Sequence, residues 1–99
     1  MPFASQLSLD DHFQRHGRLL AVDTAEEYEQ AAEFFMFGPR PAHVLECYRQ
    51  SGSTVRFDPY TRRFGVASGT ILHTFYCVDW QLIFDKGGLG TYFRWECGR

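Results

Sequence analysis

Two histidines near the amino terminus, His12 and His16, have the spacing and side-chain chemistry of an acid–base pair. Residues four apart lie on one face of a helix, so the two imidazoles would be neighbours there. An imidazole titrates near neutral pH and can accept or donate a proton while a phosphodiester bond is cleaved. The end of a helix is also an ordinary place for a cation, so a purely structural role stays open. As candidate catalysts we rank His16 first and His12 second.

The same two histidines have a spacing that also occurs in metal sites. No glutamate lies between them as in the zincin motif, and no third ligand is evident in the sequence. We therefore expect neither a metal nor another cofactor. His73 ranks third as a catalyst, because strand alternation places it on the apolar side with Ile71 and Phe75, where a core or edge histidine is expected. His43 follows a proline-rich loop and has no evident role.

A set of polar side chains is predicted to share one face of a β-sheet. Period-two patterns in three predicted strands put apolar residues on one side and four polar residues on the other. These four are Arg56, Arg63, Thr74 and Tyr76. If the apolar side faces the helices, two guanidiniums, a hydroxyl and a phenol gather on the uncovered side, where they could bind a phosphate and stabilise its developing charge. The alternative is a solvated sheet face with scattered arginines.

Helical signals fill the chain from about residue 8 to residue 37. Ser8 is a candidate N-cap for a first helix, with Asp10 and Asp11 in its first turn, where the helix dipole favours negative charge. Gly17 follows two basic residues and is typical of the end of a helix.

A second helix is predicted from Thr24, which forms a capping box with Glu27. The apolar residues that follow recur at steps of three and four, the spacing of one helix face. They are Tyr28, Ala31, Ala32 and Phe35. The sequence GPRP at residues 38–41 then ends the helix, because proline cannot continue the hydrogen-bonding pattern.

Beyond Pro41 the hydrophobic pattern changes to a period of two, which indicates strands. The candidate strands are residues 44–50, 54–57, 63–67, 70–78 and 90–95. Short links between strands favour antiparallel hairpins. We therefore predict a single α+β domain over residues 1–99, with two N-terminal helices (about 8–37) packed on a four- or five-stranded antiparallel sheet (about 44–96).

The charge of the chain is small but unevenly distributed. The formal net charge is −2, which argues against a strongly basic nucleic-acid-binding surface. Residues 1–50 carry four Lys and Arg against eight Asp and Glu, whereas residues 51–99 carry six against four. An anionic partner would therefore bind the second half. Aromatic residues make up 17% of the chain, and most of them fall on predicted core faces.

The sequence predicts a cytoplasmic protein. It shows no apolar run of the roughly 18 residues that a membrane span needs, so no membrane partner is expected, and no signal peptide is visible. Cys47, Cys77 and Cys97 form no CxxC motif, and we expect three free cysteines in a reducing compartment. A structural disulfide or a metal site is the weaker alternative. The sequence makes no prediction about the oligomeric state.

Several segments together resemble a known group of bacterial toxins. The segments are residues 11–17 (DHFQRHG), 25–28 (AEEY), 32–34 (AEF), 55–66 (VRFDPYTRRFGV) and 69–76 (GTILHTFY). Their order and spacing resemble the small C-terminal toxin domains of polymorphic and contact-dependent systems. Those domains belong to the broad barnase–EndoU–colicin–RelE group of ribonucleases. The resemblance implies an RNase-toxin-like fold of N-terminal helices followed by an antiparallel sheet.

The same resemblance implies a function and assigns some of the site. It implies a metal-independent endoribonuclease that cleaves RNA, with tRNA as one candidate, and it allows for a cognate immunity protein as a partner. His12 and His16 match the histidine motif of the group, Arg56 matches its arginine and Thr74 its late-strand threonine. Arg63 and Tyr76 are added as substrate-binding residues by the sheet-face pattern above.

The carboxyl-terminal part of the chain departs from the pattern of the toxin group. After Tyr76 the sequence continues as CVDW at residues 77–80, in place of the usual Lys-Pro-like ending, and about twenty more residues follow. The alternative function is therefore a non-catalytic protein-interaction module that keeps the toxin-like scaffold and uses its aromatic surface to bind a partner.

Overall fold

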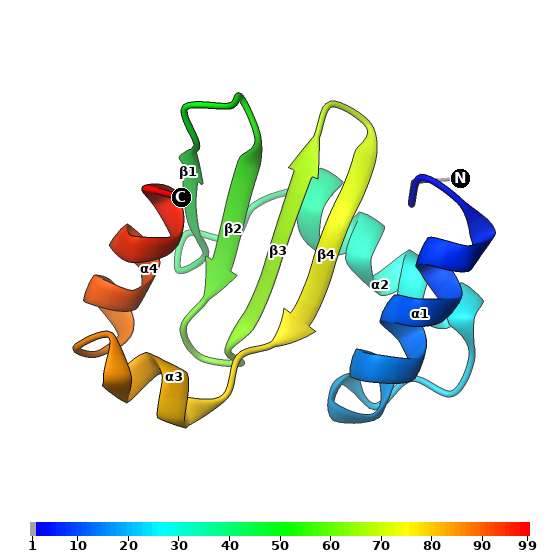
Figure 1. Ribbon diagram of the computed structural model, residues 1–99, viewed down its shortest axis with the longest axis horizontal. Coiled ribbons are helices and arrows are strands. Elements are labelled where there is room, and N and C mark those ends of the chain that lie inside the picture. The colour runs from blue at the N-terminus through cyan, green and yellow to red at the C-terminus, as the bar shows by residue number, and fades with distance from the viewer. Residues whose placement is uncertain (1) are drawn as a thin grey trace.

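A four-stranded antiparallel sheet with helices on both faces forms the core of the computed structural model, which describes residues 2–99 (Figure 1). In chain order the elements are α1 (Gln6–His16), the 3-10 helix η1 (Gly17–Leu20), α2 (Ala25–Phe37), β1 (Leu45–Tyr48), β2 (Thr54–Asp58), β3 (Arg63–Ser68), β4 (Ile71–Cys77), α3 (Trp80–Asp85) and α4 (Leu89–Cys97). The α+β prediction is confirmed. No helix within residues 2–99 is long and apolar enough to cross a membrane.

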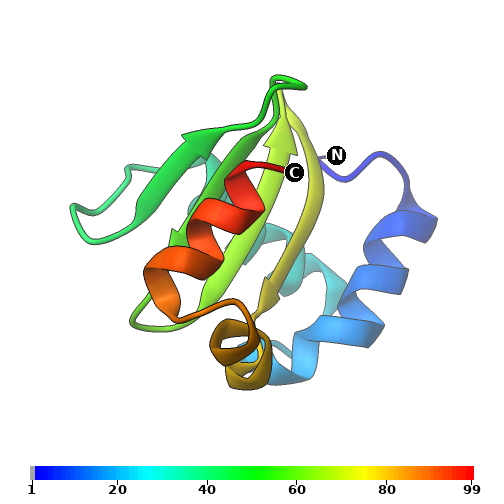
Figure 2. The same ribbon diagram turned by 60° about the vertical axis from the view of Figure 1, so that its left-hand side comes forward.

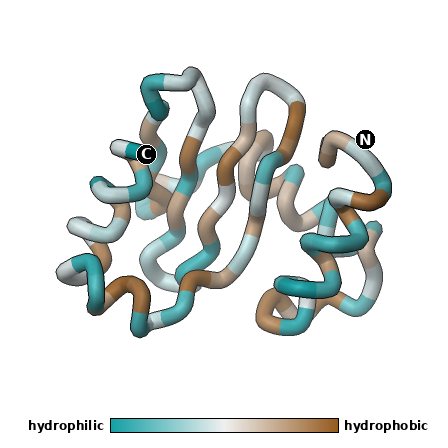
Figure 3. Tube along the Cα trace, viewed as in Figure 1, coloured by the Kyte–Doolittle hydropathy of each residue, from teal (hydrophilic) through white to brown (hydrophobic). Residues whose placement is uncertain are grey.

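The sheet is a simple meander in the order β1-β2-β3-β4, with every neighbouring pair antiparallel. Apolar and polar residues alternate along its strands (Figure 3), which is why the first four predicted strands are confirmed with small changes at their ends. Gly52 and Gly69 turn the first and third hairpins with φ angles of 95° and 58°, a region that favours glycine.

The first helix begins three residues earlier than the sequence predicts. Ser5 is the N-cap, and its side chain accepts a hydrogen bond from the backbone N–H of Ser8 at 3.1 Å, so Ser8 lies within the helix. The first turn of α1 contains no acidic residue. The sequence offers two serines at this point, and the one that precedes the apolar Leu7 and Leu9 forms the cap.

The second helix begins and ends where the sequence predicts. The Thr24 hydroxyl accepts a hydrogen bond from the backbone N–H of Glu27 at 3.1 Å. The predicted apolar stripe faces the sheet, with Tyr28 and Ala32 fully buried. Tyr28 donates a hydrogen bond from its hydroxyl to the backbone carbonyl of Phe75 in β4. This bond holds α2 across the back of the sheet (Figure 1).

Small residues in β3 let α2 approach the sheet closely. A Cβ atom at Gly65 would lie 2.6 Å from the sulfur of Met36 in α2, so a larger residue there would require the Met36 side chain to move. The core between α1, α2 and this face of the sheet contains Phe3, Leu9, Leu20, Tyr28, Ala32, Met36, Ala67, Leu72 and Phe75. This cluster is the apolar core between the sheet and the N-terminal helices.

The opposite face of the sheet is covered in part by α3 and α4 (Figure 2). The prediction of a fifth strand at residues 90–95 is therefore wrong, because this segment lies in the helix α4. Tyr92 and Glu96, one helical turn apart, are the buried residues of that helix. Aromatic residues favour strands in isolation, but here they pack as a helix face on a second apolar core. That core contains Val55, Phe57, Phe64, Val66, Val78, Ile83 and Tyr92.

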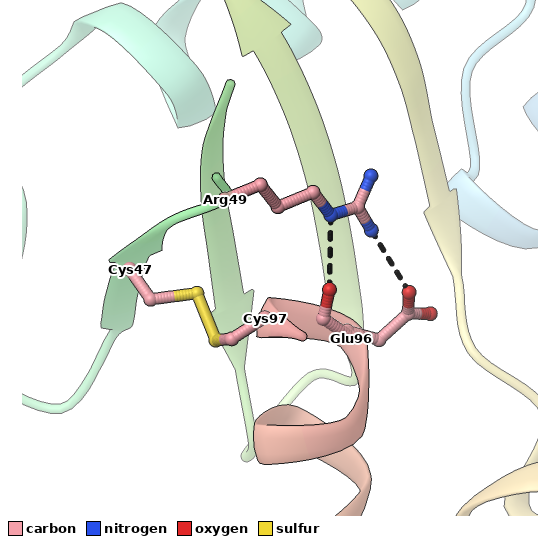
Figure 4. The surroundings of a disulfide bond; sticks show 4 residues. All are labelled: Cys47, Arg49, Glu96 and Cys97. Carbon is pink, nitrogen blue, oxygen red and sulfur yellow. Dashed lines mark hydrogen bonds and ion pairs between the residues drawn. A yellow bond between two sulfur atoms is a disulfide. The ribbon is translucent and has the colours of Figure 1, made fainter. Parts of the chain in front are cut away.

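A disulfide bond joins Cys47 in β1 to Cys97 at the end of α4 (Figure 4). The expectation of three free cysteines in a reducing compartment is therefore wrong for these two residues, and Cys77 is the free one. The pairing follows from the second helical layer, since α4 brings Cys97 to the edge strand across 50 residues of sequence.

Candidate functional site

A hollow of about 260 Å³ lies over β3 and β4, on the face of the sheet that carries α4. We call it the Tyr76 hollow. Its lining residues come from the strands, from the hairpin after β1 and from the end of α4. They are Arg49, Ser53, Phe64, Val66, His73, Thr74, Tyr76, Glu96 and Arg99. Apolar residues form its floor, and polar and charged groups surround them.

His16 lies next to this hollow through a ring contact with Tyr76. The helix α1 runs beside β4 at the edge of the sheet (Figure 1), and the rings of His16 and Tyr76 stack with centroids 5.1 Å apart. The ring of His12 lies 5.9 Å from that of His16 and 5.3 Å from that of Phe3. Three sequence-predicted site residues, His12, His16 and Tyr76, are thus brought together in one row of rings.

Both histidines on α1 are biased toward the neutral form. Burial and then the positive charge of Arg15 lower the pKa of His12 below 6.5, and Asp11 opposes them. Burial, Arg15 and the neighbouring His12 lower the pKa of His16 in the same way. The Nδ1 atom of His12 is buried and has no hydrogen-bond partner among the described residues. A neutral imidazole can accept a proton, so His16 is suited to act as a base.

The end of α4 forms one wall of the hollow, and this wall contains a buried network of charged residues. The carboxylate of Glu96, which is only 1% exposed, accepts hydrogen bonds from Arg49 at 3.0 Å, from Tyr92 at 2.7 Å and from Arg99 at 3.4 Å. Arg49 also donates from Nε to the main-chain oxygen of Glu96 at 2.9 Å (Figure 4). Two guanidiniums share one carboxylate, so this wall has an excess positive charge that can attract a phosphate.

Tyr76 lines the hollow and keeps its proton. Burial raises the pKa of its phenol, and the nearby carboxylate of Glu96 raises it further, which outweighs the opposing effects of the Tyr92 hydroxyl and the two arginines. Thr74 lies two residues before it on β4, and both line the hollow as the sequence predicts.

His73 lies in the hollow rather than on the apolar side, so the predicted placement is wrong. The pairing of β3 with β4 shifts between Val66, which faces Thr74, and Ala67, which faces Leu72. His73 is the extra residue of this irregularity, and a bulge of this kind turns a side chain to the other face. Its Nε2 atom lies 2.7 Å from the hydroxyl of Ser68.

Arg56 does not reach the Tyr76 hollow. Its guanidinium lies on the α2 side of the sheet and donates to the main-chain oxygens of Phe35 and Gly38 at 3.0 and 2.9 Å. Its Nε atom also pairs with Glu46 at 2.6 Å. These contacts fasten the end of α2 to β1 and β2. Arg56 therefore stabilises the fold in this structure.

Arg63 also lies on the α2 side, where it lines a separate pocket with residues of α2. The predicted cluster of four polar residues is thus divided between the two faces. The prediction assumed that the apolar residues of β2 and β3 face the N-terminal helices. In fact Val55, Phe57 and Phe64 face α4, so the intervening arginines point to α2.

Three charged residues of the hollow, Arg49, Glu96 and Arg99, are absent from the sequence-predicted site. Arg49 and Arg99 supply the two guanidiniums of the hollow, which the sequence predicts from Arg56 and Arg63. Tyr92 and Glu96 are four residues apart, so a helix over residues 89–97 places them on one face. This helical spacing is the sequence signal that could have identified Glu96 as a site residue.

No protein-family model matches the chain, and no curated protein matches it. Within the described residues, 2–99, no three side chains of His, Cys, Asp or Glu lie close enough to bind one metal ion.

Proposed function

We propose that the protein is a metal-independent endoribonuclease and that the Tyr76 hollow is its active site. The observation that carries the proposal is the stacking of His16 on Tyr76 at the edge of a hollow that also contains Arg49 and Arg99. A base, a hydroxyl donor and two cations are the groups that phosphodiester cleavage by a neighbouring hydroxyl needs. The resemblance of residues 8–78 to toxin ribonucleases supports the same activity.

In the proposed reaction, His16 accepts the proton of the ribose 2′-hydroxyl as its oxygen attacks the phosphorus atom. The new bond joins the 2′-oxygen to phosphorus, and the bond from phosphorus to the 5′-oxygen breaks. His73, which lines the same hollow, is the general acid and donates a proton to that leaving oxygen. The products are a 2′,3′-cyclic phosphate and a 5′-hydroxyl. The two histidines carry both protons in this reaction, so the step requires no cofactor.

The remaining residues of the hollow bind and orient the phosphate. Of the two arginines, Arg99 is more accessible to the phosphate, because its side chain is 57% exposed. The Arg49 side chain is 18% exposed and is paired with Glu96. Tyr76 and Thr74 donate hydrogen bonds to the phosphate oxygens. His12 is a positioning residue, since its ring lies 5.9 Å from that of His16, tilted against it, and it helps to lower the pKa of that imidazole.

The second candidate function, a protein-interaction module, is favoured by one surface feature. Trp80 and Phe84 of α3 are 44% and 67% exposed, and their rings stack 5.7 Å apart. Exposed aromatic pairs are common in protein–protein interfaces. Such a surface also suits an immunity protein, which the ribonuclease proposal allows.

Incubation of the purified protein with total cellular RNA in EDTA tests the proposed function. We expect RNA fragments that carry 2′,3′-cyclic phosphate and 5′-hydroxyl ends. Intact RNA would refute the ribonuclease and leave the interaction module. Fragments with 3′-hydroxyl ends would refute the attack by the 2′-hydroxyl.

A further inference from the structure

A second cavity, separate from the Tyr76 hollow, lies on the α2 side of the sheet. It has a volume of about 290 Å³ and is enclosed by α2, the loop that follows it and the turn between β2 and β3. We call it the Arg63 pocket. Its lining residues are Ala31, Phe34, Phe35, Pro39, Pro41, His43, Val44, Asp58, Thr61 and Arg63.

Most of the wall of the Arg63 pocket is apolar. Two phenylalanines from α2 and two prolines from the following loop form it, and the Phe34 side chain is 72% exposed. Rings of this kind pack well against a flat aromatic group. Pro39 and Pro41 also restrict the backbone of the loop.

At the polar end of the pocket, both oxygens of the Asp58 carboxylate already have partners within the chain. Asp58 accepts from the backbone N–H groups of Tyr60 and Thr61 at 2.9 and 3.3 Å through one oxygen, and its other oxygen lies 3.1 Å from Nε2 of His43. Burial would raise the pKa of Asp58, but these hydrogen bonds outweigh it and lower the pKa, so the carboxyl is ionised. The His43 ring is held further by stacking on Tyr60, with centroids 4.7 Å apart.

Arg63 is left as a cation without a partner at the same end of the pocket. In the strand pairing it lies opposite Asp58, yet that carboxylate is turned toward His43 and the turn. Within residues 2–99 the Arg63 guanidinium makes no hydrogen bond and no ion pair. A half-buried guanidinium beside an apolar wall favours an anion that can accept two parallel hydrogen bonds.

We propose that the Arg63 pocket binds a small aromatic carboxylate, with its ring between the phenylalanines and prolines and its carboxylate on Arg63. This ligand site goes beyond the proposed ribonuclease, because it lies on the other face of the sheet. The guanidinium of Arg63, which is free of partners within residues 2–99, is a donor only, so a ligand that binds it must supply the acceptors. At the ~30 Å³ that a water molecule occupies in the liquid, the pocket has room for about ten non-hydrogen atoms.

Phenylacetate has that size, and 2-phenylacetamide is its neutral counterpart of the same shape. Titration of each into the ¹⁵N-labelled protein, followed by amide chemical shifts, tests the proposal. We expect phenylacetate to shift residues around the Arg63 pocket and to bind about tenfold tighter than phenylacetamide, because a hydrogen bond to a charged group is worth at least that factor. Equal affinity of the two, or shifts confined to the Tyr76 hollow, would overturn it.

Two variants separate the role of Arg63 from a general effect of charge. Arg63→Gln removes the guanidinium without breaking a hydrogen bond or ion pair of that side chain within residues 2–99, and we expect it to reduce phenylacetate affinity to the level of the amide. Arg18→Gln is the matched control, since Arg18 is an exposed arginine of η1 outside the pocket, and its affinity should equal that of the unmodified protein. Unchanged binding by Arg63→Gln would also overturn the proposal, as would the absence of any shift at about 10 mM phenylacetate.

Discussion

The imidazole of His16 stacks on the phenol of Tyr76 with ring centroids 5.1 Å apart and an angle of 29° between the planes. This contact joins the end of α1 to the end of β4 and places the strongest candidate base of the sequence beside the hollow that holds Arg49 and Arg99. The account of function rests on this relationship, because neither side chain alone distinguishes a catalytic site from ordinary packing.

The pH dependence of RNA cleavage should reflect the lowered pKa of His16. Because burial and Arg15 lower this pKa, His16 is neutral at pH 7, and the part of the rate that depends on it should fall as pH drops below 6.5. In Arg15→Gln the pKa of His16 should rise, which moves this fall to higher pH. NMR titration of the His16 ring protons in both proteins measures the shift, and an unchanged or lower pKa in the variant would contradict the assignment.

The same pKa shifts make stability depend on pH. Folding lowers the pKa of His12 and of His16, so the unfolded chain binds more protons as pH falls through 6.5. The contribution to the free energy of unfolding is therefore present above pH 6.5 and is lost below it. Urea denaturation at about pH 7 and about pH 5 should show this loss, and it should be smaller in Arg15→Gln.

Reduction of the Cys47–Cys97 bond should destabilise the protein without unfolding the sheet. A loop of 50 residues closed by a disulfide contributes about 2–4 kcal/mol, mainly by restricting the unfolded chain. Urea denaturation with and without a reductant measures the difference. Cys77→Ala is the control that should respond to the reductant in the same way as the unmodified protein, whereas Cys47→Ala should not respond. An equal response of all three would contradict the bond.

Glu96 should be worth much more to stability than an exposed acidic residue. Its buried carboxylate accepts from Arg49, Arg99 and Tyr92, so Glu96→Gln leaves Arg49 without its counter-charge and should cost about 3 kcal/mol. Asp11→Asn is the matched control, because the ion pair of Asp11 with Arg15 is exposed and worth less than about 1 kcal/mol. Chemical denaturation measures both values, and similar costs would refute the network.

Arg56 and Arg99 should separate stability from activity. Arg56→Ala removes the bonds to Phe35, Gly38 and Glu46 and should lower the free energy of unfolding by about 3 kcal/mol. Arg99→Gln should leave the melting temperature nearly unchanged and slow RNA cleavage at least about tenfold, because it removes the exposed phosphate-binding cation. If cleavage by folded protein depends on Arg56 and not on Arg99, the result would instead support Arg56 as the catalytic arginine, as the sequence predicts.

The sequence predicts local structure well where one segment contains all the information. The Thr24 capping box and the stripe from Tyr28 to Phe35 predict α2, and the period-two pattern predicts the four strands. Strand alternation likewise predicts that Thr74 and Tyr76 share a face, and both line one hollow. The helical spacing of His12 and His16 predicts neighbouring rings, and these lie 5.9 Å apart.

Apart from the start of α1, where Ser5 and not Ser8 is the N-cap, the failures concern choices that depend on distant parts of the chain. Alternation shows that Val55 and Arg56 point to opposite faces, but it does not show which face α2 covers. The segment from Leu89 to Cys97 contains strand-favouring aromatics, and its helix depends on packing against β1 and β2. The irregular pairing at His73 and the bond between Cys47 and Cys97 have no local signal at all.

The most direct test of the central claim is the RNA cleavage rate of His16→Ala, measured in EDTA against Gln14→Ala, an exposed change on the same helix. If His16 is the base, its removal should lower the rate at least about 100-fold. Gln14→Ala should cleave at the rate of the unmodified protein, and both variants should keep its circular dichroism spectrum. Equal rates for the two folded variants would contradict the account.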